Sequence, residues 1–341
     1  METYRPQRQP GLDIGSSPVL RRRRVLGLLP SMAVAGLWSS MAHAHSGYPQ
    51  HPVKLVVPAP PGSSPDVMAR QWGERFSKLS GVPVLVENKT GATTIIAAQA
   101  VANAPADGYT LLWTFNNTFS INPFVFRKLP YTIEDFVPAT QVLAVPFVLL
   151  VAPQARWRTL GDLLDDARAR PNALNYGSAG MGSGFHVAMA RLLNATGTSM
   201  THVPYRDAFI PDLIAGRIDV TFDASTTAIA QVRGGTLRAL GVSDPKRLEQ
   251  LPDVPAIAET VPGYSANSWQ GLFAPKGTPN DVVQTLAALS NQIVAAPGFR
   301  SQVREYGLLP VGSTPSAFQK FVTEDARDWG RVIRDNRITI D

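Results

Sequence analysis

Residues 53–66 read VKLVVPAPPGSSPD, a β-branched run followed by prolines, a glycine, serines and an aspartate. The run at 53–58 favours a strand, and the proline-rich stretch after it ends the strand. Apolar side chains then recur at helical spacing from Val67 to Leu79, and Gly81 follows. A strand, a short loop and an amphipathic helix in this order predict an α/β fold.

The same alternation of strands and helices continues along the chain. The first part adds strands at 82–87 and 110–114 around a helix at 95–103. The later part has expected helices at 160–169, 185–196, 209–215 and 227–232 and expected strands at 175–178, 200–203, 219–222 and 237–242. Such alternation predicts parallel strands covered by helices. We therefore expect two α/β lobes, each a mainly parallel sheet flanked by helices, without a tandem sequence repeat.

The length of 341 residues indicates two lobes rather than one small domain. Two apolar runs, at 146–151 and 270–274, are interpreted as crossovers between the lobes. The helical C-terminal stretch, 279–341, is expected to return to the first lobe. The predicted division is 45–148 with 273–341 for the first lobe and 149–272 for the second.

The N-terminus has the layout of a secretory signal peptide. Arg21 to Arg24 precede an apolar stretch at 25–37, and Ala42-His43-Ala44 is a small-x-small cleavage pattern. A transmembrane anchor is the alternative, but the stretch is shorter than the roughly 20 residues that span a bilayer. We predict that residues 1–44 are cleaved and that the protein is periplasmic, exported by the Sec or the twin-arginine route.

Composition excludes several classes of function. The chain has no cysteine, so it has no disulfide, thiolate metal site or cysteine nucleophile. Its net charge is +6, and much of this excess lies in the arginine-rich leader. No basic stripe with interleaved aromatic residues is present, so nucleic-acid binding is not expected. We also expect no cofactor and no metal.

Three loops have the composition of a ligand site. The first is 60–66, the second is 114–120 (TFNNTFS), and the third is 178–184 (SAGMGSG). In α/β sheets, ligands bind beyond the carboxyl ends of strands, where free N–H groups at helix starts hold carboxylates without a cationic side chain. Each loop alone is also compatible with an ordinary helix cap. Together they favour a ligand cleft, and two facing helix starts would suit a dicarboxylate.

A hydrolase is the catalytic alternative. Ser178 and Ser183 lie near His186 in sequence, and Asp223 could complete a triad. Neither serine has the flanking glycines of a nucleophile elbow, and no phosphate-binding motif is present. His186 is better interpreted as a capping or packing histidine, so we do not expect an enzyme.

Several segments in order and spacing resemble one known family. They read YPQHPVKLVVPAPPGSSPDVMAR, VLVENKTGA, APADGYTLL, INPFVFRKLPY, LNYGSAGMGSGFH, HVPYR, GRIDVTFDA, GTLRALGVSDPKRLEQLPDVPAIAE and GLFAPKGTP. The chain resembles the Bug-type receptors, the extracytoplasmic solute-binding components of tripartite tricarboxylate transporters. This resemblance implies a Venus-flytrap periplasmic binding protein fold with a small organic carboxylate clamped between the lobes.

The resemblance also implies roles for particular positions. The loop at 60–66 would hold one carboxylate through backbone groups and waters, and the loop at 178–184 would add donors from the other lobe. Tyr205 and residues 223–225 match further cleft positions, where Asp223 could meet a ligand amine or hydroxyl or bond to backbone. The candidate ligand-binding residues are Pro61, Gly62, Ser63, Ser64, Asp66, Phe115, Asn116, Asn117, Ser178, Ala179, Gly182, Ser183, Gly184, Phe185, His186, Tyr205, Asp223, Ala224 and Ser225.

The chain departs from the family pattern in its loops. Ser63 stands where relatives have a second glycine, and residues 89–94 read KTGATT in place of a proline and several glycines. Phe115, Phe119 and Phe185 are bulkier than usual and are expected to face the cleft. They predict an aromatic or bulky carboxylate rather than a short aliphatic diacid, unless these rings pack into their own lobes.

Two functions of this fold stay open from sequence. The first is a transport receptor that delivers its carboxylate to membrane transporter subunits. The alternative is a periplasmic sensing adaptor that acts on a membrane sensor kinase. In either role we expect a monomer.

Overall fold

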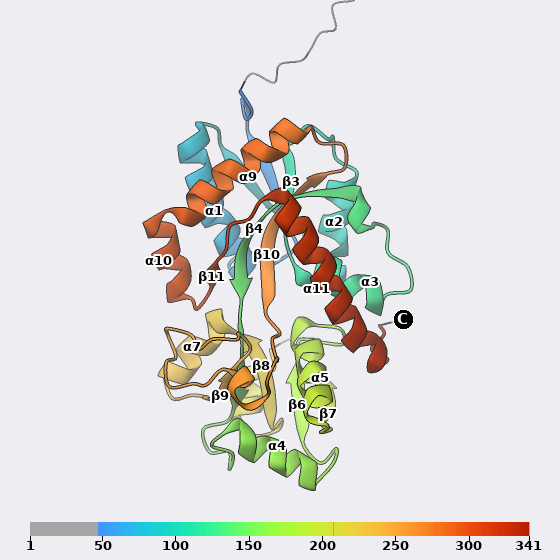
Figure 1. Ribbon diagram of the computed structural model, residues 1–341, viewed down its shortest axis with the longest axis vertical. Helices are drawn as coiled ribbons and strands as arrows, with labels where there is room; N and C mark the ends of the chain where they lie inside the picture. The colour runs from blue at the N-terminus through green and yellow to red at the C-terminus, as the bar shows by residue number, and fades with distance from the viewer. Residues whose placement is uncertain (1–46, 207, 341) are drawn as a thin grey trace, which may run out of the picture. The chain divides into compact units, whose positions relative to one another are not determined.

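The computed structural model describes residues 47–206 and 208–340 (Figure 1). The predicted leader, residues 1–44, therefore lies outside the described residues. Across the described ranges, no helix combines the length and the apolar character needed to cross a membrane.

The first lobe is built on a six-stranded sheet of order β11-β4-β10-β3-β1-β2. β1 pairs in parallel with β2 and β3, whereas β10 runs antiparallel to β3 and β4. The strands are β1 (Val53–Val57), β2 (Val84–Asn88), β3 (Thr110–Phe115), β4 (Phe136–Val145), β10 (Ser268–Pro275) and β11 (Leu309–Pro310). The helices that follow or cover them are α1 (Ser64–Ser80), α2 (Ile95–Ala102), α3 (Asn122–Val125), α9 (Asn280–Ala295), α10 (Pro297–Glu305) and α11 (Pro315–Asp335), with short turns η1 (Ala92–Thr94), η2 (Asn117–Ile121) and η3 (Ile133–Asp135).

The second lobe is built on a five-stranded sheet of order β7-β6-β8-β5-β9. β6 is parallel to β7 and β8, and β5 is antiparallel to β8 and β9. Its strands are β5 (Phe147–Val151), β6 (Asn175–Ser178), β7 (Thr201–Pro204), β8 (Val220–Ala224) and β9 (Arg238–Val242). Its helices are α4 (Leu160–Ala169), α5 (Gly184–Thr196), α6 (Ile210–Ile214), α7 (Ser225–Arg233) and α8 (Ile257–Thr260).

The two-lobe α/β architecture is confirmed, but both sheets are mixed rather than mainly parallel. The reason is that β4, β5 and β10 each run antiparallel to both of their neighbours. The loop expected at 114–120 is another difference, because the chain leaves β3 at Phe115 and enters the helical turn η2 at Asn117. The ten-residue strand β4 was not anticipated from sequence.

The chain passes from one sheet to the other between β4 and β5, with Pro146 between them, and returns between β9 and β10. Each of β5 and β10 lies wholly within one sheet, whereas the boundaries predicted at 148/149 and 272/273 fall inside these strands. The exact division into lobes remains a prediction.

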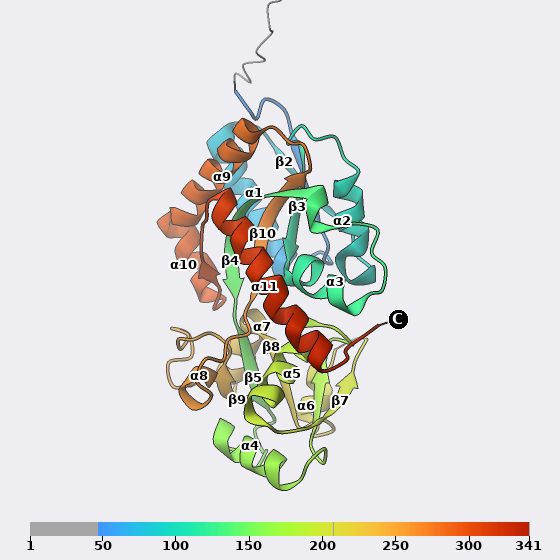
Figure 2. The same cartoon turned by 45° about the vertical axis from the view of Figure 1, so that its right-hand side comes forward.

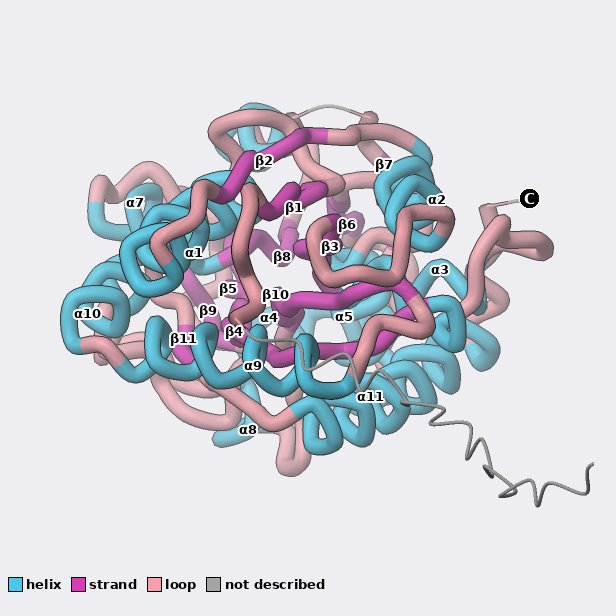
Figure 3. The backbone as a smooth tube through the Cα atoms, turned by 90° about the horizontal axis from the view of Figure 1, so that it is seen from above, coloured by secondary structure: helices cyan, strands magenta, loops and turns pink. Residues whose placement is uncertain are grey.

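The cores explain why these segments form these elements. In the first lobe, α1 buries Met68, Trp72 and Phe76 against the strand residues Leu55 and Trp113. In the second lobe, α5 buries Val187 and Leu192 in a cluster with Leu149 of β5. This second cluster also contains Trp329 and Ile333 of α11. The last long helix therefore contacts α5 of the second lobe, and it also packs on β4 of the first lobe (Figure 2). Figure 3 shows the first sheet from above, with α1 and α9 on one side.

Candidate ligand-binding site

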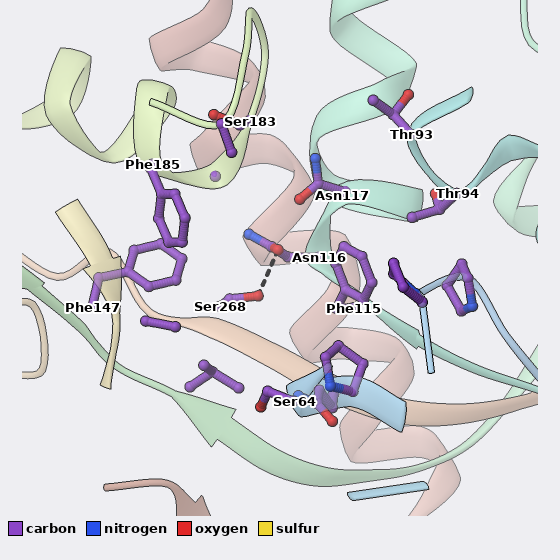
Figure 4. Close-up of a pocket in the computed structure, with 18 of the residues that line it drawn as sticks. Ser64, Thr93, Thr94, Phe115, Asn116, Asn117, Phe147, Ser183, Phe185 and Ser268 are labelled. Atoms are coloured by element: carbon purple, nitrogen blue, oxygen red, sulfur yellow. Dashed lines mark hydrogen bonds between the residues drawn. The ribbon is translucent and has the colours of Figure 1, made fainter. Parts of the chain in front are cut away.

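A cavity of about 470 Å³ is lined by residues from both sheets and from the helix starts that follow them (Figure 4). This volume lies in the range of small-molecule sites. The lining residues are Pro58, Pro60, Ser64, Pro65, Thr90, Gly91, Thr93, Thr94, Phe115, Asn116, Asn117, Val145, Phe147, Ala179, Met181, Ser183, Gly184, Phe185, Ala224, Ser268 and Gln270. None of them carries a charged side chain.

The start of α1 forms one wall. Ser63 is its N-cap, with extended backbone, and its hydroxyl donates to the Pro60 carbonyl at 2.6 Å instead of capping the helix. Ser64 lines the cavity, and its Oγ is buried without a hydrogen-bond partner. Helix starts carry free N–H groups and a partial positive charge, so this wall favours an anion.

Asp66 holds this loop in place from behind. Its carboxylate accepts from the Gly62 amide at 2.8 Å, from Asn88 Nδ2 at 2.8 Å and from Arg70 Nε at 3.0 Å. Burial by itself would raise the pKa of Asp66, but the bonds from Arg70, Asn88 and Gly62 outweigh it and hold the pKa below its usual value. Gly62 has a φ of 80°, a conformation that glycine adopts most readily.

The start of α5 forms the opposite wall. Ser183 is the N-cap, and its Oγ accepts from the His186 amide at 3.3 Å. Gly184 brings the backbone close to other walls, because a Cβ on it would lie 3.3 Å from Phe147 Cζ and 3.9 Å from Asn116 Nδ2. The α5 start, like that of α1, thus lines the cavity, and the first amides of a helix have no partner within the helix.

A stacked pair of histidines, His186 buried and His202 half-buried, supports the α5 loop. His186 Nδ1 accepts from the Gly182 amide at 3.1 Å, and His202 Nε2 bonds Ser178 Oγ at 2.7 Å. The two imidazoles stack with centroids 3.7 Å apart. Burial lowers the pKa of His186 to about 3, with a further contribution from His202, and burial lowers the pKa of His202 to about 4. Both rings are therefore neutral at physiological pH.

Two buried amides contribute polar groups to the cavity. Asn116 is 1% exposed, its Oδ1 accepts from Ser268 Oγ at 2.6 Å, and its Nδ2 has no partner. Gln270 is 2% exposed, and its Oε1 accepts from Trp113 Nε1 at 3.0 Å. Each amide thus has its oxygen committed to a neighbouring side chain.

Phenylalanine rings form the apolar part of the lining. Phe147 and Phe185 meet edge to face with centroids 4.9 Å apart, and Phe115 lies across the cavity from them in Figure 4. The expectation that Phe119 faces the cleft is wrong. Its ring is 2% exposed and packs against Tyr131, Phe136 and Phe273, because η2 turns it into the first lobe's core.

The segment that follows β2 closes another side. Thr93 and Thr94 line the cavity, and Ala92, Thr93 and Thr94 have φ values of 43°, 47° and 82°. Thr94 Oγ1 accepts from Thr118 Oγ1 at 2.8 Å and from Asn122 Nδ2 at 3.2 Å. Positive φ values are unfavourable for residues other than glycine, and ligand sites often contain residues that surrounding bonds hold in such conformations.

Comparison with known proteins places the chain in a family. A profile described as tripartite tricarboxylate transporter family receptor matches residues 68–338. The chain belongs to this family. Its members are periplasmic solute-binding receptors rather than enzymes, which confirms the resemblance drawn from sequence.

Individual relatives agree with this assignment. The chain is 36% identical over 324 residues to a protein from Pseudomonas sp. (strain P51) described as the UPF0065 protein in the tcbD-tcbE intergenic region, covering 93% of this chain and 95% of that one. A Rhodopseudomonas palustris protein solved with adipate is 32% identical with a TM-score of 0.78, covering 86% of this chain and all of that one. MatC from the same species, solved with malate, is 28% identical with a TM-score of 0.73, covering 84% and 100%.

Of the ligand-binding residues predicted for this family receptor, some line the cavity and others do not. Those lining the cavity are Ser64, Phe115, Asn116, Asn117, Ala179, Ser183, Gly184, Phe185 and Ala224. Those outside the lining are Pro61, Gly62, Ser63, Asp66, Ser178, Gly182, His186, Tyr205, Asp223 and Ser225.

Several residues outside the lining have identified partners. Tyr205 donates to Asp212 at 2.7 Å. Asp223 accepts from the Ala224 amide at 2.8 Å and from Thr227 Oγ1 at 2.6 Å, so it bonds to the start of α7. Burial raises the pKa of Asp223 to about 6. With Asp223 bonded there and His186 Nδ1 bonded to Gly182, the serine, histidine and aspartate considered for catalysis do not form a relay.

Sequence reasoning did not single out several lining residues, among them Phe147, Ser268, Gln270 and Thr93. Phe147 lies in β5, and Ser268 and Gln270 lie in β10; the runs at 146–151 and 270–274 in these strands were interpreted as crossovers. Thr93 belongs to the KTGATT segment, whose departure from the family pattern was the available signal. No local pattern marks Phe147 or Gln270, because their role comes from the position of the strands in the two sheets.

Proposed function

We propose that this chain is an extracytoplasmic receptor that binds a small organic carboxylate between its lobes and delivers it to the membrane subunits of a tripartite transporter. The observation that carries this proposal is the convergence of the α1, α5 and α7 starts on one cavity lined by uncharged side chains. Backbone N–H groups at helix starts bind carboxylates without a cationic side chain. The adipate and malate found in two related structures support the same ligand class.

The walls favour a carboxylate with an aromatic or bulky body. Phe115, Phe147 and Phe185 offer flat apolar surfaces, and a bound ring would make offset or edge contacts with them. A short aliphatic diacid would leave much of this surface uncovered. The aromatic preference is therefore part of the proposal, together with a periplasmic, monomeric receptor. The sensing alternative has no observation in its favour.

Calorimetry on the mature protein tests both the binding of a carboxylate and the preference for an aromatic one. Benzoate should bind more tightly than succinate, malate or adipate, and Phe185→Ala should weaken benzoate binding about fivefold, as for loss of a ring contact of about 1 kcal/mol. Tyr306→Ala, a control that removes an exposed ring outside the cavity lining, should leave affinity unchanged.

The outcomes separate the general proposal from its finer part. Tighter binding of the aliphatic acids, or a Phe185→Ala variant that is less stable but binds normally, contradicts the aromatic preference alone. Absence of binding to every carboxylate tested contradicts the receptor proposal itself.

A further inference from the structure

Two side-chain amides, Asn116 and Gln270, line the cavity as hydrogen-bond donors with their oxygens already occupied. Trp113 Nε1–H can only donate, so the Gln270 amide must turn its Oε1 toward the indole. Its Nε2 is then left for other acceptors. Gln270 lies on β10, two residues beyond Ser268, which donates to Asn116.

Asn116 has an unsatisfied donor at the same cavity. Figure 4 shows its oxygen toward Ser268 and its nitrogen on the side of Phe185. That nitrogen is buried without a partner and lies near Gly184 at the α5 start. A buried donor without an acceptor is unfavourable, and a ligand oxygen at this position would supply the missing acceptor.

The cavity lining offers no counter-charge to a cation. No carboxylate lines it, and the two nearest candidates from sequence, Asp66 and Asp223, are bonded to their own loops. The starts of α1 and α5 add partial positive charge. A ligand ammonium would therefore be desolvated without a counter-charge.

We propose that the amide donors of Asn116 and Gln270 select carboxylates whose second polar group is an oxygen acceptor, such as an oxo group or a second carboxylate. The same site rejects the amino acid of equal skeleton. This inference rests on the carboxylate-receptor proposal but does not depend on the aromatic body of the ligand.

Matched ligand pairs test the selectivity by calorimetry on the mature protein. The pairs are phenylpyruvate with phenylalanine and 2-oxoglutarate with glutamate. In at least one pair, the oxo acid should bind at least about tenfold more tightly than the amino acid, because the latter leaves a donor unpaired and an ammonium uncompensated.

Near-isosteric variants then identify the residues responsible. Asn116→Asp and Gln270→Glu keep the oxygen that accepts from Ser268 or Trp113 but replace the donor with an acceptor. Each should shift the affinity ratio about tenfold toward the amino acid. The ratio of the two affinities is compared, rather than either affinity alone, because the new negative charge repels the carboxylate of both ligands equally. Gln284→Glu, an exposed position on α9, adds the same charge elsewhere and should leave the ratio unchanged.

Each outcome decides between the two proposals. If no carboxylate binds, including benzoate, adipate and malate, the receptor proposal fails and this inference falls with it. If carboxylates bind but the amino acids bind as tightly as the oxo acids, or neither member of either pair binds, the proposed selectivity of the amide donors alone is overturned. An unchanged ratio in folded Asn116→Asp and Gln270→Glu overturns the assignment to these residues.

Discussion

Several titratable side chains next to the cavity hold its loops rather than facing it. His186 and His202 lie under the α5 loop, and Asp223 bonds to the start of α7. Their pKa values are shifted by burial, which in other settings marks catalytic groups. Here the hydrogen bonds show that the shifts accompany loop support, so shifted pKa values at this site indicate rigidity rather than chemistry.

The histidine pair makes stability depend on pH. Because folding lowers both pKa values from 6.5, the unfolded chain binds protons that the folded chain does not as the pH falls from 6.5 toward 4. The free energy of unfolding should therefore fall over this range. His202→Gln should reduce that fall by about 2 kcal/mol, allowing for partial exposure of His202, in urea titrations at pH 7, 5.5 and 4.5.

Asp223 should change the pH dependence of stability in the opposite direction to the histidines. Its pKa is raised from 3.8 to about 6, so the folded chain keeps a proton that the unfolded chain has lost between these values. This group stabilises the fold as the pH is lowered through that window. Asp223→Asn should thus steepen the loss of stability on acidification. Identical pH profiles for wild type, His202→Gln and Asp223→Asn would contradict both assignments.

A methyl group at Gly184 tests how tightly the walls meet. The Cβ of Gly184→Ala would lie 3.3 Å from Phe147 Cζ, so the ring must shift slightly. Alanine is favourable in a helix, so the unfolding temperature should stay within a few degrees of wild type. Ligand affinity should fall about threefold or more because the cavity narrows. Unchanged affinity would show that the ligand does not reach this wall.

At the scale of the elements, the loop between β1 and α1 depends on one buried carboxylate. The Asp66 carboxylate accepts hydrogen bonds from the backbone amide of Gly62 before the helix, from the Arg70 side chain within the helix and from the Asn88 side chain at the end of β2. It thereby joins three elements at the cavity wall. The exposed pair between Glu74 and Lys78 on the same helix has the same i, i+4 spacing but no such connection.

This difference predicts unequal effects of two similar substitutions on α1. Asp66→Asn removes the charge that pairs with Arg70 and should lower the free energy of unfolding by about 1–3 kcal/mol, with weaker ligand binding. Glu74→Gln should change stability by less than about 0.5 kcal/mol, because exposed pairs contribute little. Chemical denaturation measures both. Equal effects would mean that Asp66 does not pin the loop.

At the scale of the whole molecule, the described chain joins its lobes through more than the β4–β5 and β9–β10 passages. α11 contributes Trp329 and Ile333 to the core around α5 while also packing on β4. Within the first lobe, Trp269 of β10 and Trp329 of α11 both donate to Asp325 of α11, at 2.7 and 2.9 Å, so α11 is fixed to β10 while it packs against α5. These contacts oppose large rearrangement of the lobes but leave the β4–β5 passage at Pro146 as a candidate hinge.

Ligand binding should both stabilise and compact the protein. A ligand at 100 times its dissociation constant adds about 2.7 kcal/mol to the free energy of unfolding. If the lobes hinge, small-angle scattering should also show a smaller radius of gyration at saturation. A thermal shift without any change in scattering would contradict closure while leaving binding intact.

Export is tested on protein purified from its native host. The arginine-rich leader and the Ala42-His43-Ala44 pattern predict that mature protein begins near His45 and is found in the periplasm. N-terminal sequencing measures this directly. An intact Met1 would overturn the predicted cleavage.

The sequence by itself determined the alternation of strands and helices, the family and the helix starts that line the cavity. It could do so because hydrophobic periodicity, glycines and capping residues act within a few positions along the chain. The α4 bounds, for example, match the predicted 160–169. Ser64, Ser183 and Phe185 could likewise be placed at a cavity because they sit at such starts.

Only the tertiary structure decided which side chains reach the cavity and what they offer there. Phe119 turns into the core while Phe147, from a strand of the other sheet, becomes a wall. Asn116 and Gln270 present donors because Ser268 and Trp113, more than 150 residues away along the chain, occupy their oxygens. The physical reason is that the direction of a loop side chain depends on the partner that folding brings beside it, and no local pattern specifies that partner.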